Sequence, residues 1–218
     1  MAYDNWQELQ AYLGDRFTLN LVPANDRTKD NVIARKGIDF YQHEAEERLY
    51  VETTKALNYL REPFFTYVRE AAPPCEVLDY ECGIGSDGLR LATMGYTPTF
   101  ADEPGVCVDY LKWRLKWRGL VAQIHKPKNT PRLPLAVWCG PPEEVPALDR
   151  LAELGQTVAL GVGPLEWSLL EAYNERARVQ IANAYGLLRW QPFNVNWLFI
   201  AFETPEPIRA QTEEVADG

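Results

Sequence analysis

The chain contains 218 residues, of which 46% are hydrophobic, and it has a formal net charge of −9. It is long enough to bury the core of one compact domain, whereas its acidic balance disfavours binding to nucleic acid through a clustered basic face. No stretch approaches the ~18 apolar residues that cross a bilayer, and the first residues lack the features of a signal peptide. We therefore expect a cytoplasmic protein with neither membrane nor nucleic-acid partners.

The N-terminal third is predicted to be mainly helical. Residues 5–13 have the spacing of a short amphipathic helix, whereas residues 14–40 mix proline, glycine and scattered charges and predict an irregular arm. Between residues 44 and 70, apolar side chains recur at helical spacing, which predicts a helix bent at Pro63. We interpret residues 1–72 as a helical arm and cap that precedes the main domain.

The most informative segment, residues 76–89, reads EVLDYECGIGSDGL. An apolar run that ends in a carboxylate, turns through closely spaced glycines and continues as a helical pattern predicts the first strand, loop and helix of a nucleotide-binding α/β sheet. Gly83, Gly85 and Gly88 fit the dinucleotide pattern G-x-G-x-x-G, and Asp102 lies about twenty residues further on, where an acid meets a ribose. A nicotinamide-dependent oxidoreductase, which would bind NAD, is therefore one candidate.

The residues before the glycines favour a different family. In the dinucleotide pattern the strand runs apolar into its first glycine, whereas here Asp79, Glu81 and Cys82 intervene. The sequence Val-Leu-Asp-x-x-Cys-Gly-x-Gly instead resembles the class I S-adenosylmethionine-dependent methyltransferases, whose first strand usually ends Val-Leu-Asp-x-Gly-Cys-Gly-x-Gly. Four later segments resemble the second, fourth, fifth and last strands of that family, namely residues 95–102, 135–140, 155–162 and 196–202. The resemblance covers residues 75–204.

The resemblance implies a doubly wound α/β domain over residues 73–204, with a seven-stranded, mostly parallel sheet and the added N-terminal helical cap. Helices are predicted at about residues 86–94, 105–118, 146–154 and 165–184. The basic residues within 112–118 are interpreted as the last turns of a helix that Gly119 ends. Residues 186–190 are predicted to pair with the final strand as a closing hairpin, and residues 205–218 to form an acidic tail.

The same resemblance implies S-adenosylmethionine as the cofactor and assigns residues to it. Gly83 and Gly85, through the backbone of their loop, would hold the methionine part. Asp79 would support that loop or bind the amino group. Asp102, at the end of the second strand, would accept hydrogen bonds from the ribose hydroxyls, and Glu103 could share that role.

Two positions depart from the family pattern. Glu81 stands where the family usually has its first loop glycine, at a point where the backbone passes against the methionine part of the cofactor. The third strand, predicted near residues 121–125, is followed by Lys126 and then Asn129, without the acid that commonly meets the adenine amine. Both departures support an alternative interpretation, a protein that kept the fold as a binding or scaffold module without catalysis.

Candidates for acceptor binding and acid–base chemistry are few. Three aromatic side chains could wall an apolar acceptor pocket at the cofactor edge, or else pack in the core: Tyr41, Trp138 and Trp167. Three residues could act as a base, or else lie at helix ends: His43, Glu143 and Glu144. The four cysteines, Cys75, Cys82, Cys107 and Cys139, have no metal-ligand spacing and are predicted to be reduced. No metal site or nucleophile–base pair is predicted.

Three function classes follow from these patterns. The first is an enzyme that methylates a small, partly aromatic or apolar acceptor, as the resemblance and the acidic charge favour. The second is a non-catalytic protein of the same fold with a protein partner, as Glu81 favours. The third is the NAD-dependent oxidoreductase, supported only by the spacing of the glycines.

Overall fold

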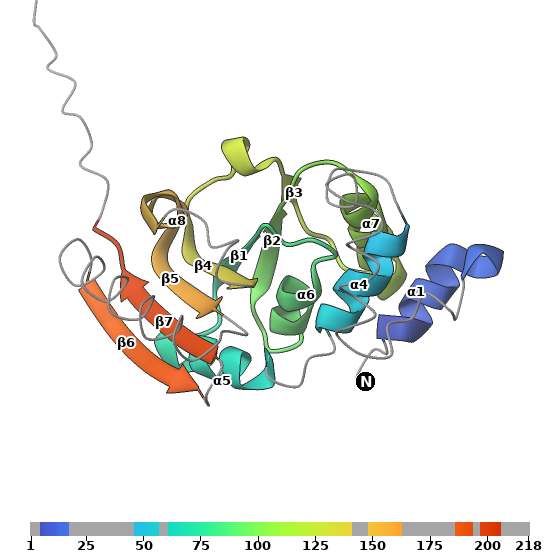
Figure 1. The fold of residues 1–218 in the computed structure, drawn as a ribbon. Coiled ribbons are helices and arrows are strands. Elements are labelled where there is room, and N and C mark those ends of the chain that lie inside the picture. Colours follow the sequence, from blue (N-terminus) through green and yellow to red (C-terminus); the bar gives the residue numbers. More distant parts are fainter. Residues whose placement is uncertain are drawn as a thin grey trace, which may run out of the picture.

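The computed structural model describes residues 5–17, 46–56, 61–140, 148–162, 186–193 and 197–205. The strands in these parts form one sheet in the order β3-β2-β1-β4-β5-β7-β6 (Figure 1). Their bounds are β1 Glu76–Tyr80, β2 Thr97–Ala101, β3 Ile124–His125, β4 Leu133–Gly140, β5 Gly155–Val162, β6 Gly186–Phe193 and β7 Trp197–Glu203. The pairs from β3 to β5 are parallel, whereas β7 runs antiparallel to both β5 and β6.

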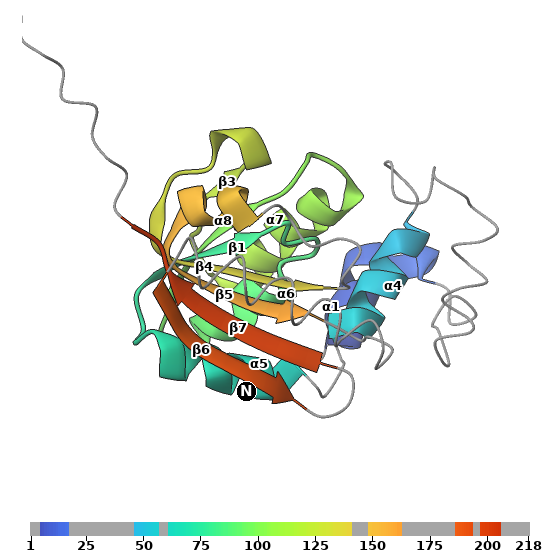
Figure 2. The same ribbon diagram turned by 60° about the vertical axis from the view of Figure 1, so that its left-hand side comes forward.

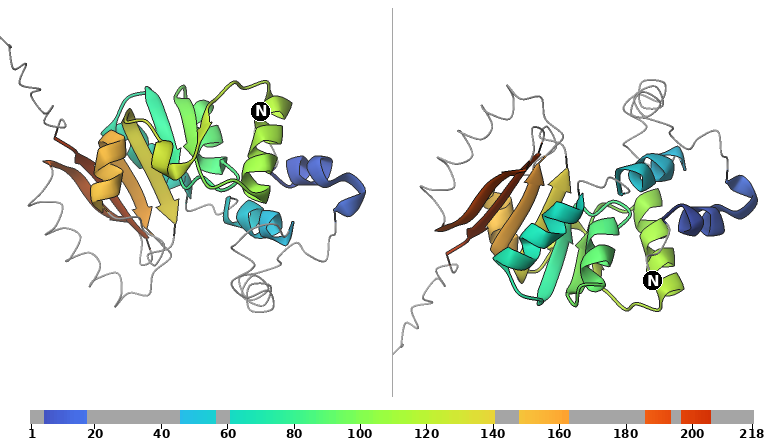
Figure 3. Two further views of the ribbon diagram at one scale, coloured as in Figure 1. Left: turned by 90° about the horizontal axis from the view of Figure 1, so that it is seen from above. Right: turned by 90° about the horizontal axis from the view of Figure 1, so that it is seen from below.

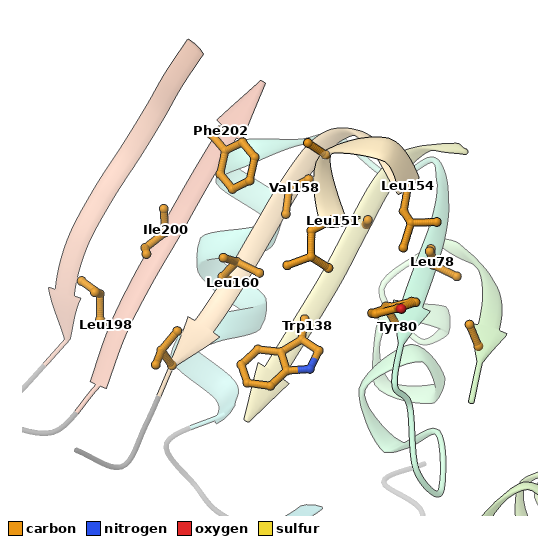
Figure 4. Packing of buried hydrophobic residues seen from close by; sticks show 14 residues of the cluster. Leu78, Tyr80, Trp138, Leu151, Leu154, Val158, Leu160, Leu198, Ile200 and Phe202 are labelled. Carbon is orange, nitrogen blue, oxygen red and sulfur yellow. The ribbon is translucent and has the colours of Figure 1, made fainter. Parts of the chain in front are cut away.

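Helices cover both faces of the sheet (Figures 2 and 3). Their bounds are α5 Arg61–Ala71, α6 Ser86–Ala92, α7 Val106–Arg118 and α8 Leu148–Leu154. Successive residues of a strand point to opposite faces, so Val77 packs with α5 and α6 while Leu78 packs with α8. Figure 4 shows the α8 side, where Leu151 and Leu154 contact the strands. Burial on both faces explains why the central strands are apolar almost throughout.

Two N-terminal helices pack beside α7 instead of on the sheet (Figure 3). They are α1, Asn5–Leu13, and α4, Glu47–Ala56. Leu9 of α1 and Leu49 of α4 share a buried cluster with Tyr110 of α7 and with Ile84, which belongs to the loop after β1. The N-terminal helices therefore share one buried cluster with the glycine loop.

Most elements lie where the sequence predicts them, with one clear difference. The expected helix over residues 44–70, bent at Pro63, is described as α4 and α5, with residues 57–60 outside the description. Pro63 lies in the first turn of α5, where the lack of an N–H costs no helical hydrogen bond.

Other differences are smaller. The third strand is limited to Ile124–His125, shorter than residues 121–125. The helix predicted at 165–184, most of the arm at 14–40 and nearly all of the acidic tail lie outside the described residues. None of the described helices has the length and apolar character needed to cross a membrane.

Candidate functional site

The loop that joins β1 to α6 makes a tight turn at the carboxyl edge of the sheet. Three of its residues have positive φ: Glu81 at +55°, Gly83 at +53° and Gly85 at +71°. Gly85 N–H donates to the Cys82 carbonyl at 2.7 Å, which closes the turn. The strand order reverses direction at β1, with β2 on one side and β4 on the other. In open α/β sheets, ligands bind at this switch point, outside the carboxyl ends of the strands.

Two carboxylates fix the loop and the first turn of α6 that follows it. The buried Asp79 accepts a hydrogen bond from Gly88 N–H at 2.8 Å through Oδ2. Asp102, which follows β2, accepts from Gly83 N–H at 2.6 Å through Oδ2 and from Glu103 N–H at 2.7 Å through Oδ1. Burial raises the pKa of Asp102, and these two backbone N–H groups oppose that rise. Each Asp102 oxygen keeps lone-pair capacity for a further donor.

Glycine is needed at the positions of the motif for different structural reasons. A Cβ on Gly85 would lie 2.4 Å from Leu111 Cδ1, and one on Gly88 would lie 2.4 Å from Phe100 Cε1. Gly88 therefore lets α6 approach β2 closely, and Gly85 lets α7 approach the loop closely. A Cβ on Gly83 would lie 3.6 Å from Glu52 Oε2 of α4, which is an ordinary contact distance. At Gly83 the constraint is the positive φ rather than the available space.

Glu81 adopts the conformation that a glycine would adopt with less strain. A non-glycine residue at positive φ costs roughly 1–2 kcal/mol. The Glu81 carboxylate is bonded to a side chain of β4, because Trp138 Nε1 donates to Glu81 Oε2 at 3.1 Å. Figure 4 shows the indole nitrogen of Trp138 facing Tyr80, the last residue of β1. Gly140 makes room for this ring, since a Cβ there would lie 2.9 Å from Trp138 Cζ2.

Trp138 packs in the core, which is one of the two roles that the sequence left open. It is 4% exposed and belongs to the core cluster beneath α8, yet its one polar atom contacts the loop. The contact with Glu81 was not predicted, because Trp138 lies on β4 and Glu81 lies in the loop after β1, and neither sequence pattern indicates the other.

A buried ion-pair cluster connects the loop to the N-terminal helix. Arg114 of α7 is 1% exposed. Its Nη1 donates to the Ile84 carbonyl at 2.8 Å and to Ser86 Oγ at 2.9 Å, while its Nε donates to Glu8 Oε2 at 2.9 Å. Arg118 also pairs with Glu8. Burial lowers the pKa of Arg114, and the nearby Glu8 carboxylate opposes that effect.

The basic run at 112–118 is thus more than a helix end. Gly119 does end α7, with φ +65° and its N–H bonded to the Leu115 and Lys116 carbonyls, as predicted. Arg114 and Arg118, however, face inward, one helical turn apart. Helix α4 brings two more charged residues near the loop: Arg48, which lowers the pKa of Asp102, and Glu52, which raises it.

The segment after β3 is a short 3-10 turn, Pro127–Asn129. Asn129 N–H donates to the Lys126 carbonyl at 2.9 Å, and Thr130 Oγ1 donates to the same carbonyl at 3.1 Å. The Asn129 and Lys126 side chains are exposed. The turn reaches the same sheet edge as the loop, because β3 is parallel to β2.

Several predicted residues lie outside the described parts of the chain, namely Tyr41, His43, Glu143, Glu144 and Trp167. The four cysteines are free thiols, as predicted. Burial raises the pKa of Cys82 well above its ordinary value, which keeps that thiol protonated. Within the described residues, no group of His, Cys, Asp and Glu side chains is arranged to hold a metal ion.

No protein-family model and no curated protein sequence matches this chain. Solved structures do match it. The methyltransferase domain of bacterial CtHen1-CN gives a TM-score of 0.52 at 16% identity, covering 67% of this chain and 100% of that one. Ribosomal protein L11 methylase from Lactobacillus delbrueckii subsp. bulgaricus gives 0.51 at 16% identity, covering 68% and 80%. Thermoplasma acidophilum 1320 gives 0.51 at 11% identity, covering 71% and 88%.

The chain therefore has the Rossmann-like α/β fold of the class I S-adenosylmethionine-dependent methyltransferases. This confirms the family resemblance that residues 76–89 indicated, at the level of the fold. The mostly parallel sheet flanked by helices is also confirmed.

Proposed function

We propose that this protein binds S-adenosylmethionine at the carboxyl edge of β1 and β2 and transfers its methyl group to a small-molecule acceptor. One observation carries the proposal: at the switch point of the sheet, Asp102 after β2 accepts from the glycine loop, and Asp79 from β1 accepts from Gly88 in the first turn of α6. The residues present fit the cofactor, since Asp102 keeps acceptor capacity for the ribose hydroxyls and Glu103 lies beside it.

Methyl transfer from a sulfonium is an in-line displacement, for which S-adenosylmethionine supplies the electrophilic methyl group. The protein's task is mainly to place the acceptor atom and to exclude water. Helices α1 and α4 support this task as an N-terminal cap, because they share a buried cluster with Ile84 of the loop. Trp138 of β4 supports the same edge from the core, because its Nε1 donates to Glu81 Oε2.

A second candidate is a non-catalytic protein of the same fold. Two observations favour it: Glu81 holds a strained backbone conformation with its side chain at the sheet edge, and the turn at Pro127–Asn129 has no carboxylate for the adenine amine. Such a protein would bind a protein partner or a nucleoside without catalysing transfer, since sites are lost more readily than folds.

Calorimetric titration with S-adenosylmethionine, with its demethylated product and with NAD tests these candidates. We expect micromolar affinity for the first two and no binding of NAD. At about 100-fold excess over Kd, the ligand should stabilise the protein by roughly 2.7 kcal/mol in thermal unfolding. Binding without methyl transfer to any acceptor in a small-molecule panel would favour the second candidate. Saturating titration with neither heat nor thermal shift would eliminate the proposed function.

A further inference from the structure

The outer face of α7 carries an exposed apolar patch. Within the described parts of the chain, the exposed large apolar side chains are Trp117, Leu120 and Val121, which all lie where α7 ends. Trp117 is 59% exposed and Val121 is fully exposed. Contiguous exposed apolar side chains often mark a surface that another molecule covers. We propose that this face of α7 is covered by a second copy of the same chain, in a two-fold symmetric dimer.

A column of stacked rings holds the patch in place. Trp117 stacks on Trp113, with ring centroids 4.9 Å apart and planes inclined by 18°. Trp113 stacks in turn on the buried Tyr110 at 6.0 Å, and Tyr12 of α1 packs edge-on against Trp113 at 5.5 Å. The stack therefore orders the Trp117 ring while leaving much of it exposed. A side chain that is already ordered loses little entropy when a partner covers it.

The charges on the same face are arranged to match themselves. Asp109 and Lys116 are exposed and lie about two turns apart, so they share one side of α7. When a two-fold axis passes through a helix face, the two copies of the helix run antiparallel. With the axis midway between these residues, Asp109 of each protomer lies opposite the partner's Lys116. Asp109 also binds Lys112 of its own helix, and its two carboxylate oxygens can accept from both lysines.

The same axis brings apolar ends of the face together. Pro104, which precedes α7, is exposed, and Val106 in its first turn is half-buried. In the antiparallel arrangement, the end of α7 that carries Trp117 and Leu120 meets the end that carries the partner's Pro104 and the partner's Val106. Removal of these apolar groups from water favours association, and the symmetry provides the contact twice.

This face of α7 differs from the chain as a whole in its charge. The formal net charge of −9 makes two copies repel each other at long range. On the exposed face, however, Lys112 and Lys116 outnumber Asp109. The two copies therefore meet where the acidic excess is absent. Lys112 lies near the axis, close to the partner's Trp113, and an ammonium group above an indole ring is favourable.

Sedimentation velocity at low ionic strength tests the inference with a pair of charge reversals. The wild type should sediment as a dimer. Asp109→Lys and Lys116→Asp should each weaken the dimer at least about tenfold, because both contacts then join like charges. An equimolar mixture of the two variants should recover a dimer within about threefold of the wild-type dissociation constant. Recovery requires that position 109 of one protomer meets position 116 of the other.

The matched control is Glu153→Lys, which changes the net charge as Asp109→Lys does. Glu153 is an exposed acid of α8, which covers the face of the sheet opposite to α6 and α7, and its reversal should leave the dimer unchanged. Trp117→Ser keeps the charges of α7 and should also weaken the dimer at least about tenfold. Urea unfolding checks that each variant is folded. Should a charge reversal fail to fold, Trp117→Ser decides the test, because most of this ring is exposed.

Three results would overturn the inference. A wild type that stays monomeric at its highest soluble concentration would leave the patch to a different partner. A wild-type dimer that neither the reversals nor Trp117→Ser weaken would be joined through another surface. Weakening by both reversals without recovery in their mixture would exclude the antiparallel arrangement. None of these results bears on the proposed function, because no substituted residue is assigned to the nucleoside.

Discussion

The glycine loop, residues 81–85, and the turn after β3, residues 126–130, lie at the same edge of the sheet but are held differently. The loop is fixed by residues that are distant from it in the sequence, namely Asp102 after β2 and Arg114 of α7. The turn is held mainly by bonds among its own residues, with one further bond from Arg150 to the Pro127 carbonyl. One half of the proposed nucleoside site is therefore built by tertiary structure, and the other half has no comparable polar framework.

Removing Arg114 should affect the loop most strongly. In Arg114→Leu the Ile84 carbonyl loses its donor, and Glu8 is left buried with fewer partners. Breaking a buried pair in this way costs about 3–5 kcal/mol, to be measured as the unfolding free energy in urea. The control is Lys112→Leu on the same helix, whose exposed pair with Asp109 contributes within about 1 kcal/mol. Equal losses in both variants would show that the cluster does not support the loop.

The substitution Gly85→Ala should cause the next largest loss of unfolding free energy. The left-handed conformation costs roughly 1–2 kcal/mol for a non-glycine residue, and the contact at 2.4 Å with Leu111 adds an overpacking cost of about 1–3 kcal/mol. Gly119→Ala is the matched control, because it has φ +65° and no atom within 4 Å of the new Cβ. Urea unfolding of both variants should therefore differ by the packing cost alone. Equal destabilisation would contradict the close packing described for the loop.

The smallest effects are expected on nucleoside affinity. They concern one substitution beside the glycine loop and one in the turn after β3. Asp102→Asn should weaken nucleoside binding about 10- to 100-fold, since a charged hydrogen bond contributes roughly 1.5–3 kcal/mol. Asn129→Ala should change it less than about twofold, because the turn offers no polar framework. Titration calorimetry measures both. Similar losses in the two variants would remove the contrast between the loop and the turn.

The wild-type affinity should also depend on pH through Asp102. Burial raises the pKa of this carboxyl above 3.8, so its protonation begins at a higher pH than for an ordinary aspartate. Protonation removes the charge that accepts from the ribose hydroxyls. Nucleoside affinity should consequently fall as the pH is lowered through this raised pKa, and Asp102→Asn should lack that step.

The strands and the loop were predictable because their signals are local. An apolar run such as Val77–Leu78, followed by an acid and closely spaced glycines, can be read within a single segment, and burial on both faces leaves β4 and β5 nearly free of polar residues. The helix end at Gly119 was likewise predicted from adjacent residues. These are features that neighbouring residues determine.

The contacts that complete the candidate site could not be predicted in this way. Arg114 forms its buried pair with Glu8, which is 106 positions away in the sequence. The sequence indicated only that Arg114 and Arg118 share one face of a helix, so that their side chains leave it in the same direction. The contact between Glu81 and Trp138 joins residues 57 positions apart. Neither pairing leaves a periodic pattern, because each depends on how separate elements meet.

The pairing of Glu8 with Arg114 also constrains the order in which the chain can assemble. During synthesis, α1 emerges more than a hundred residues before α7, so its buried carboxylate has no arginine partner until β1, β2 and α7 have been made. Long-range contacts of this kind form late and slowly. The buried pair that joins α1 to the loop side of α7 can therefore form only after both ends of this long segment have been made and the first helix has returned to α7.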